Sequence, residues 1–406
     1  MSDDLPALPG LSDIEQAQEV LRGVSICTPM EESRWLSGLA GGPVRLKAEN
    51  LQRTGSFKIR GAYLRMSRLS DAERGNGVVA ASAGNHAQGV ALAAQLLGIK
   101  ATVFMPEGAP IPKEKATRGY GADVRFQGDS VDDALVAAKA FAAETGAVLI
   151  HPFDHVDIVT GQGTCGLEIL DQCPEVRTVL VSCGGGGFIA GIATAIKAKR
   201  PDVRVIGVQA EGAAAYPNSL DEGRPVPLES MSTMADGIAV GCPGDVPFRA
   251  IQQNVDEMIT VSEESLSRAL LMLLERAKLL VEPAGAAAVA AVLDHPTRFE
   301  TPAVAVLSGG NVDPLLLMRV IRHGMAAAGR YLSFRVRIGD TPGGLARMLG
   351  ELADVEANVL DVVHERTSTQ LHLDEVEVAL QVETRGGEHA ARVLARLREC
   401  GYHVSE

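Results

Sequence analysis

Short apolar runs of strand length alternate with helical patterns along most of this chain. The runs rich in β-branched residues lie at 77–82, 101–106, 122–126, 178–182, 203–209 and 303–308. A helical pattern stands next to each of them, such as the stretch of alanines and leucines at 87–97. Apolar strands that alternate with helices are typical of parallel sheets covered by helices on both faces. The pattern therefore predicts an α/β fold with two such sheets.

The pattern changes after residues 324–330, which we interpret as a helix end and a short linker. Residues 331–338 alternate between apolar and polar, as a half-buried strand does. A helix is predicted to begin at Thr341, with this residue as its cap and Pro342 in its first turn. Further elements are predicted as strands at 358–365 and 373–383 and a helix at 387–400. This βαββαβ order predicts a small ferredoxin-like module with its boundary near Arg330.

Length and charge narrow the classes of protein. A chain of 406 residues is expected to form two or three domains. Its net charge of −13 and the lack of a basic run argue against nucleic acid and anionic membranes as partners. Residues 1–10 lack the pattern of a secretion signal, and no apolar run reaches the ~20 residues of a membrane span. Six scattered cysteines are expected to be reduced thiols in a cytoplasmic protein.

Lys58 lies in a short stretch of apolar and small residues, between a predicted strand at 44–50 and a helix that begins near Ile59. A lysine at such a junction can be partly desolvated, which lowers its pKa and favours the neutral amine. A neutral lysine amine can form a Schiff base and can also move a proton. Because most lysines are solvated surface charges, Lys58 becomes a catalytic candidate only together with the motifs that follow.

Four consecutive glycines, 184–187, lie between a predicted strand and a predicted helix. Glycines let several N–H groups converge on one anion, and the helix N-terminus adds a favourable dipole. The alternative is an ordinary strand-to-helix turn. The Gly-x-x-x-x-Gly-Lys pattern of an ATP-binding loop is absent, and Ile189 breaks the glycine spacing of a dinucleotide site. The segment is a candidate phosphate cradle.

Two more polar segments follow predicted strands. Residues 82–89, Ser-Ala-Gly-Asn-His-Ala-Gln-Gly, open a helix, so their amides with the Ser82 hydroxyl and the Asn85 amide can hold a carboxylate. Ser308 follows the last strand of the main region, where ligands bind in α/β sheets. Each segment has a structural alternative: a capped helix start at 82–89, a buried hydrogen-bonded ring for His86, and a capping hydroxyl for Ser308.

The four motifs, Ser-Phe-Lys-Ile-Arg-Gly at 56–61, the 82–89 segment, the tetraglycine loop and Ser-Gly-Gly-Asn at 308–311, resemble one family in this order. The chain is similar to threonine dehydratase (threonine ammonia-lyase) over about residues 15–325. That family belongs to the fold-type II pyridoxal-phosphate enzymes, related to the tryptophan synthase β chain. The C-terminal module resembles an ACT domain, and residues 340–345 match its ligand loop. The resemblance implies a catalytic region at 1–325, with a small subdomain at about 47–151 inserted in it, and a regulatory domain at 331–406.

The resemblance also implies roles. Lys58 forms the Schiff base with pyridoxal phosphate, Phe57 flanks its ring, and Asn85 hydrogen-bonds its 3′ oxygen. The phosphate is held by Gly184, Gly185, Gly186 and Gly187, and Ser308 faces the pyridine nitrogen. The substrate carboxylate is received by Ser82, Asn85 and His86 with neighbouring amides. The effector loop of the ACT-like module contains Asp340, Gly343, Gly344 and Leu345.

The implied reaction is β-elimination. Threonine gives 2-oxobutanoate and ammonia, and serine is expected to give pyruvate. The ACT-like module is expected to bind an amino acid such as isoleucine or valine, and the resemblance implies a homotetramer or homodimer. A biosynthetic and a catabolic role both stay open, as does the preference between threonine and serine.

Other functions remain as alternatives. A serine racemase or serine dehydratase is the nearest, but Ala83 stands where the racemase motif has a second serine that can carry a proton. Glu211 stands where the racemases have a divalent-metal site, yet Tyr216 and Pro217 occupy the place of its acidic partner. A loop or a weak monovalent-cation site is therefore expected there, and not a magnesium site, so no metal ligand is predicted. An amino-acid sensor without activity would lack the lysine or the glycine loop, and a nucleotide-dependent dehydrogenase needs another glycine spacing.

Overall fold

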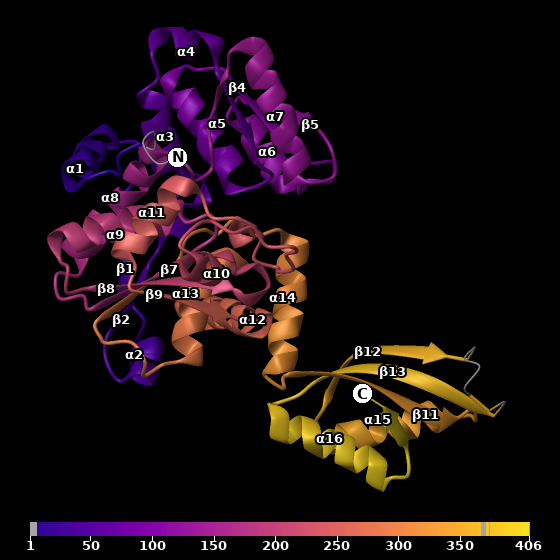
Figure 1. Ribbon diagram of the computed structural model, residues 1–406. Coiled ribbons are helices and arrows are strands. Elements are labelled where there is room, and N and C mark those ends of the chain that lie inside the picture. Colours follow the sequence, from indigo (N-terminus) through magenta and orange to yellow (C-terminus); the bar gives the residue numbers. More distant parts are fainter. Residues whose placement is uncertain (1–5, 367–370, 373, 406) are drawn as a thin grey trace. The chain divides into compact units, whose positions relative to one another are not determined.

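The computed structural model describes residues 6–366, 371–372 and 374–405. The chain divides into two compact units, Met1–Leu317 and Met318–Glu406. Helix α14 (Pro314–Ala327) lies across this division (Figure 1). The domain limits expected from the sequence, 325 and 331, fall at the C-terminal end of that helix and stay predictions.

The larger sheet of the first unit has six strands in the order β1-β2-β10-β7-β8-β9. All neighbouring strands are parallel except β1 and β2. The strands are β1 (Met30–Glu32), β2 (Val44–Lys47), β7 (Thr178–Ser182), β8 (Arg204–Ala210), β9 (Glu257–Val261) and β10 (Ala303–Val306). The helices are α1 (Leu11–Val20), α2 (Arg34–Ala40), α8 (Val156–Gln172), α9 (Gly187–Lys199), α10 (Ala215–Glu222), α11 (Asp245–Asn254), α12 (Glu263–Met272) and α13 (Pro283–Asp294).

Helices cover both faces of this sheet, with α8, α9 and α11 on one side and α12 and α13 on the other (Figure 1). Val179 and Val181 belong to the core formed with the first group, and Leu180 between them is fully buried as well. Successive side chains of a strand point to opposite faces, so an apolar run without alternation requires cover on both. The predicted covering of the parallel sheet by helices on both faces is confirmed for this sheet.

The smaller sheet has four parallel strands in the order β5-β4-β3-β6. Its strands are β3 (Val78–Ala81), β4 (Ala101–Met105), β5 (Asp123–Phe126) and β6 (Val148–Leu149), and the nearby helices are α3 (Lys58–Ser67), α4 (Asp71–Asn76), α5 (Asn85–Leu97), α6 (Ile111–Gly119) and α7 (Val131–Thr145). Val78 and Ala80 pack with α5, whereas Val79 and Ala81 pack with α7. The prediction of two parallel sheets is therefore confirmed.

The second unit is a four-stranded antiparallel sheet in the order β12-β13-β11-β14. Its elements are β11 (Tyr331–Gly339), α15 (Gly344–Asp354), β12 (Asn358–Glu365), β13 (Glu375–Glu383), α16 (Gly387–Glu399) and β14 (His403–Ser405). Both helices lie on one face of the sheet (Figure 1), where alternate residues of β13 are buried. The βαββαβ prediction is confirmed, although the expected first residue of its third strand, Leu373, lies outside the described residues.

One detail of the second unit differs from the prediction. Helix α15 has Gly343 as its N-cap, so the prediction of a Thr341 cap is wrong. Thr341 belongs to the turn that precedes the helix. Its carbonyl accepts a hydrogen bond from the N–H of Gly344 and closes this turn. Gly343 has a φ of +81°, a conformation that glycine adopts without strain.

Two further observations concern the chain as a whole. Across the part of the chain that the structure describes, no helix is long and apolar enough to cross a membrane. All six cysteines are free thiols, three of them buried.

Candidate active site

Lys58 is the first residue of α3, which follows β2 and the two short turns η1 (Glu49–Leu51) and η2 (Arg53–Gly55). The strand predicted at 44–50 ends at Lys47, because η1 takes its last residues. The Lys58 amine donates a hydrogen bond to the carbonyl of Pro152 at 2.9 Å. Burial lowers the pKa of Lys58 to about 8, and the charge of Glu282 opposes this shift. The amine is therefore neutral far more readily than that of a surface lysine.

A buried ionic network fixes the start of α3. The guanidinium of Arg60 lies 2.8 Å from a carboxylate oxygen of Glu49 and 2.7 Å from one of Glu168. Lys47, at the end of β2, contacts the second oxygen of Glu168 at 2.6 Å. Two cations and two anions are thus paired away from water, which is the condition for burying such charges. The network ties the turn after β2, α3 and α8 together two residues from Lys58.

Two contacts join the Lys58 segment to the last strand of the sheet. Ser56 and Gly309 form an isolated antiparallel bridge. The N–H of Phe57 donates to the carbonyl of Ser308 at 3.3 Å. The Ser308 side chain is 3 % exposed, and its hydroxyl accepts a hydrogen bond from the Ser182 hydroxyl at 3.0 Å. Ser308 is therefore buried beside Lys58, although 250 positions separate them in the sequence.

The tetraglycine loop 184–187 connects β7 to α9, as expected. Among the described residues, no acceptor takes a hydrogen bond from the N–H groups of Gly184, Gly185, Gly186 or Gly187. These free donors lie at the N-terminus of a helix, the arrangement that binds a phosphate. The loop thus fits the phosphate of the expected cofactor.

Each position of this loop excludes a side chain. A Cβ added to Gly185 would lie 2.5 Å from the ring of Phe153, and one added to Gly186 would lie 1.9 Å from the Tyr216 hydroxyl. At Gly184 and Gly187 the nearest atoms would be at 2.9 Å, and Gly186 has a φ of +94°. Close packing behind the loop, and not flexibility, therefore accounts for the four glycines.

Tyr216 orients one peptide of the loop. Its hydroxyl donates to the carbonyl of Gly185 at 3.2 Å, and the N–H of Gly244 donates to the same oxygen at 3.3 Å. The carbonyl and the N–H of a trans peptide point in opposite directions. The N–H of Gly186 is therefore directed away from Tyr216, toward the open side of the loop.

The loop and Lys58 are neighbours in space. Phe57 stacks on Phe188, with ring centroids 3.8 Å apart and planes inclined by 6°. A second connection between Lys58 and the loop is made by two consecutive residues. Pro152 accepts the hydrogen bond of Lys58, and Phe153 packs against the glycines. One lysine amine and one anion cradle are thereby assembled from segments distant in sequence.

The 82–89 segment follows β3, and its residues from Asn85 onward form the start of α5. The hydroxyl of Ser82 accepts from the N–H of Gly84 at 3.1 Å, which shapes the turn before the helix. His86 is buried and its Nε2 lies 2.7 Å from the carbonyl oxygen of Ile150. Burial lowers the pKa of His86 to about 3, so the ring is neutral. Because the ring is buried and hydrogen-bonded within the protein, the main-chain N–H of His86 is the group that can bind a carboxylate.

Asn85 lies in a chain of hydrogen bonds that the sequence analysis missed. Its Nδ2 donates to Glu282 at 2.6 Å, and its Oδ1 accepts from Asn311 at 2.8 Å. Glu282 precedes the alanine-rich helix α13, and no pattern in the sequence marks it as a site residue. Asn311 belongs to the Ser-Gly-Gly-Asn motif, which could have drawn attention to it.

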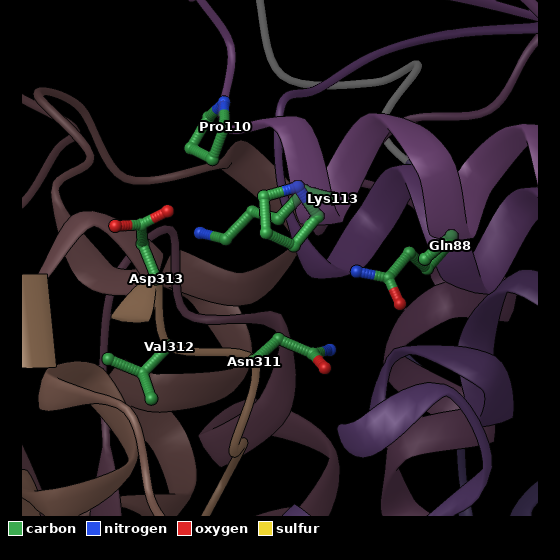
Figure 2. A pocket seen from close by; sticks show the side chains of 8 residues that line it. Gln88, Pro110, Lys113, Asn311, Val312 and Asp313 are labelled. Atoms are coloured by element: carbon green, nitrogen blue, oxygen red, sulfur yellow. The ribbon is translucent and has the colours of Figure 1, made fainter. Parts of the chain in front are cut away.

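A pocket of about 90 Å³ lies beside this network (Figure 2). Its lining residues are Gln88, Pro110, Pro112, Lys113, Ala116, Asn311, Val312 and Asp313. Lys113, on α6, forms an ion pair of 2.9 Å with Asp236 and also lies near the 82–89 loop, since a Cβ on Gly84 would be 3.9 Å from its amine. The pocket therefore has both apolar and charged residues in its lining, and it adjoins the predicted carboxylate loop.

The predicted effector residues lie in the second unit, at the start of α15. The carboxylate of Asp340 accepts hydrogen bonds from Arg366 at 3.0 and 3.2 Å, and these bonds lower the pKa of Asp340. Gly343 and Gly344 form the turn into the helix, and Leu345 packs against the core of the module. Their role in effector binding stays a prediction.

Glu211 begins the short turn η3 (Glu211–Ala213) and is exposed. Within residues 6–366, 371–372 and 374–405, no three His, Cys, Asp or Glu side chains gather as a metal site.

Known proteins resemble the chain along most of its length. Residues 22–309 match the model of the pyridoxal-phosphate dependent enzyme family. An L-threonine ammonia-lyase of Thermotoga maritima is 45% identical over 394 residues, which cover 97% of this chain and 98% of that protein.

Two solved structures add to this. The processed form of threonine deaminase isoform 2 from Solanum lycopersicum has a TM-score of 0.74 and 37% identity, covering 78% of this chain and 95% of that one. A maize serine racemase has a TM-score of 0.74 and 34% identity, covering 79% of this chain and 99% of that one. The fold-type II architecture is thereby confirmed. From the matched residues, the relatives and the cradle that fits a phosphate, the chain belongs to the family of pyridoxal-phosphate dependent enzymes.

Proposed function

We propose that this enzyme is a threonine ammonia-lyase, which converts L-threonine to 2-oxobutanoate and ammonia and also converts L-serine to pyruvate. The observation that carries the proposal is the junction of Lys58 with the glycine loop, made by the stack of Phe57 on Phe188. The relative named for this activity, which is similar over 97% of the chain, supports the same substrate.

Pyridoxal phosphate, when bound, supplies the electron sink for the negative charge that develops at the substrate Cα. Lys58 holds the cofactor, and its amine then takes the proton from Cα. A pKa of about 8 suits this second task, because a base works best when its pKa lies near the working pH. The N–H groups of Gly184, Gly185, Gly186 and Gly187 hold the phosphate.

Ser308 faces the ring nitrogen in this proposal. Its hydroxyl accepts from Ser182, which leaves its own hydrogen free to donate to the ring nitrogen. A neutral hydroxyl does not keep the ring nitrogen protonated as a carboxylate does. The sink is then weaker, which favours elimination, because the leaving hydroxyl carries the charge away.

The 82–89 segment receives the substrate carboxylate in this proposal. The Ser82 hydroxyl and the main-chain N–H groups of Asn85 and His86 provide donors at the N-terminus of α5. The side-chain amide of Asn85 hydrogen-bonds the 3′ oxygen of the cofactor in this proposal. Asn85 also lies close to Gly309, since a Cβ on that glycine would be 3.0 Å from its Nδ2. This contact places the segment beside the Ser308 loop and supports one shared site for cofactor and substrate.

Serine racemase is the competing function, because racemases are among the similar structures. Racemisation needs a group that delivers a proton on the face opposite the lysine. Ala83, at the position that the racemase motif fills with serine, carries no such group. Elimination is therefore the proposed main reaction.

The second unit is proposed to be an amino-acid sensor of the ACT type. Its βαββαβ order and the Gly343 turn at the start of α15 support binding of an amino acid such as isoleucine or valine. We also propose a homodimer or homotetramer and a cytoplasmic location, where free thiols such as the six found here stay reduced.

Steady-state kinetics of the holoenzyme with threonine and with serine test the function. We expect 2-oxobutanoate and pyruvate respectively, and we expect Lys58→Ala to lose both activities. Normal turnover by that variant would contradict the role of Lys58, and no ketoacid from the wild type would contradict the function. The sensor is tested by adding isoleucine or valine to the full chain and to a chain that lacks residues 331–406. An unchanged response after the deletion would contradict it.

A further inference from the structure

Glu282 is buried at the N-cap of α13, with 2 % of its surface exposed, and it is not part of any step described so far. Its Oε1 accepts the hydrogen bond from Asn85 at 2.6 Å. A Cβ on Gly309 would lie 2.3 Å from the same oxygen, so the carboxylate fits tightly between Asn85 and the loop after Ser308. A carboxylate this deep in the protein requires a partner to offset its desolvation.

The orientation of the Asn85 amide can be traced to a main-chain oxygen. Asn311 Nδ2 lies 2.6 Å from the carbonyl of Thr54, which can only accept, so this atom is a donor. The same Nδ2 lies 2.8 Å from Asn85 Oδ1, which must therefore be an acceptor. The Nδ2 of Asn85 then faces Glu282 with one hydrogen and keeps its second hydrogen unused.

We propose that Glu282 is a positioning residue: together with Asn311 it locks the amide of Asn85 so that the second N–H of this amide is presented to the cofactor. This inference rests on the proposed contact of Asn85 with the cofactor. Glu282 acts through Asn85 and does not touch the cofactor itself. The oxygen of the Asn85 amide is held by Asn311, which Thr54 orients, and its nitrogen is held by Glu282.

The charges around Glu282 are consistent with a fixed hydrogen bond. The pKa of Glu282 is raised to about 7, first by burial and then by the charge of Asp236, whereas Lys113, the Asn85 bond and Lys58 oppose this rise. These groups come from η4 (Asp236–Ile238), α6, α5 and α3, all packed near the carboxylate. In either protonation state one oxygen of Glu282 can still accept from Asn85.

The test compares Glu282→Leu, Glu282→Gln and Asn85→Ala in cofactor titrations of the apoenzyme without substrate. For Glu282→Leu we expect pyridoxal phosphate to bind about 10-fold more weakly or worse, since losing an orienting bond to a buried charged group costs at least that much. We also expect a shift of the long-wavelength absorption band of the bound cofactor. Glu282→Gln keeps an acceptor oxygen, so its affinity and spectrum should lie closer to the wild type.

The double variant separates positioning from a general loss of structure. If Glu282 acts through Asn85, Glu282→Leu added to Asn85→Ala should weaken cofactor binding by less than about 2-fold further, because the effects are coupled. If the double variant loses affinity by the product of the two single losses, the proposal is overturned. A wild-type affinity and spectrum for Glu282→Leu would overturn it as well.

A matched control guards against instability as the cause. Glu263→Leu removes another carboxylate at a helix N-terminus, one that accepts from the N–H of Met234 at 2.8 Å. It should leave cofactor affinity and spectrum unchanged, and an equal effect there would overturn the assignment. Because these readouts need no amino-acid substrate, they stand or fall separately from the activity with threonine.

Discussion

Ser56 and Gly309 pair through their main chains and thereby hold the segment before Lys58 against the segment after Ser308. The consequence is that the proposed base, Lys58, and the proposed partner of the ring nitrogen, Ser308, are brought together by main-chain pairing. A site built this way depends on the packing behind it, and the predictions below test that packing and its charges.

The pKa of Lys58 makes the stability of the apoprotein depend on pH. Burial lowers this pKa from 10.5 to about 8. Between these pH values the unfolded chain binds more protons than the folded protein. The cost of burying the charged Lys58 amine therefore lowers the free energy of unfolding in full below pH 8, and this loss disappears as the pH rises toward 10.5. We expect the free energy of unfolding to gain at most about 3 kcal/mol over this window from Lys58 alone.

Urea unfolding of the apoprotein at about pH 7.5 to 10 measures this gain. Lys58→Met has no titrating group and should lack that part of the slope. If the variant and the wild type show equal slopes, the lowered pKa of Lys58 is wrong.

Gly186→Ala is expected to lose cofactor affinity. The new Cβ would lie 1.9 Å from the Tyr216 hydroxyl and would strain a residue with a φ of +94°. Displacing the loop should weaken pyridoxal phosphate binding by about 10-fold or more, which equilibrium titration measures. Gly41→Ala is the control, because Gly41 also has a positive φ but nothing lies within 4 Å of its added Cβ. Equal losses in both variants would point to general strain and not to the loop.

Arg60→Met is expected to destabilise the protein strongly. It would leave Glu49 and Glu168 buried without their shared partner, and breaking a buried pair in this way costs about 3–5 kcal/mol. Chemical denaturation of the apoprotein measures the loss. Arg60→Lys keeps one charge but not the fork of donors, so it should recover only part of the stability. A stable Arg60→Met protein would contradict the importance of the network.

Ala83→Ser tests the choice between elimination and racemisation. The added hydroxyl gives the site a proton carrier at the position of the second serine of the racemase motif, so we expect slow formation of D-serine from L-serine while elimination continues. Chiral chromatography of the product measures it. D-serine formed by the wild type as fast as pyruvate would show that Ala83 does not decide the reaction.

The sequence by itself determined the two parallel sheets, the βαββαβ module and the polar segments between strands and helices. Apolar runs such as 178–182 and the alternation at 331–338 specify how each strand is buried, because burial depends on local pattern. The tetraglycine loop was also visible, since its four glycines are consecutive.

Only the tertiary structure decided which side chains meet. Glu282 and Asn311 join Asn85 from places that no local pattern connects, and Tyr216 reaches the glycine loop across 31 positions. The hydrogen bond between the His86 ring and the carbonyl of Ile150 depends on the same long-range packing. Hydrogen bonds act over about 3 Å in space whatever the separation along the chain, so the fold and not the local sequence fixes these partners.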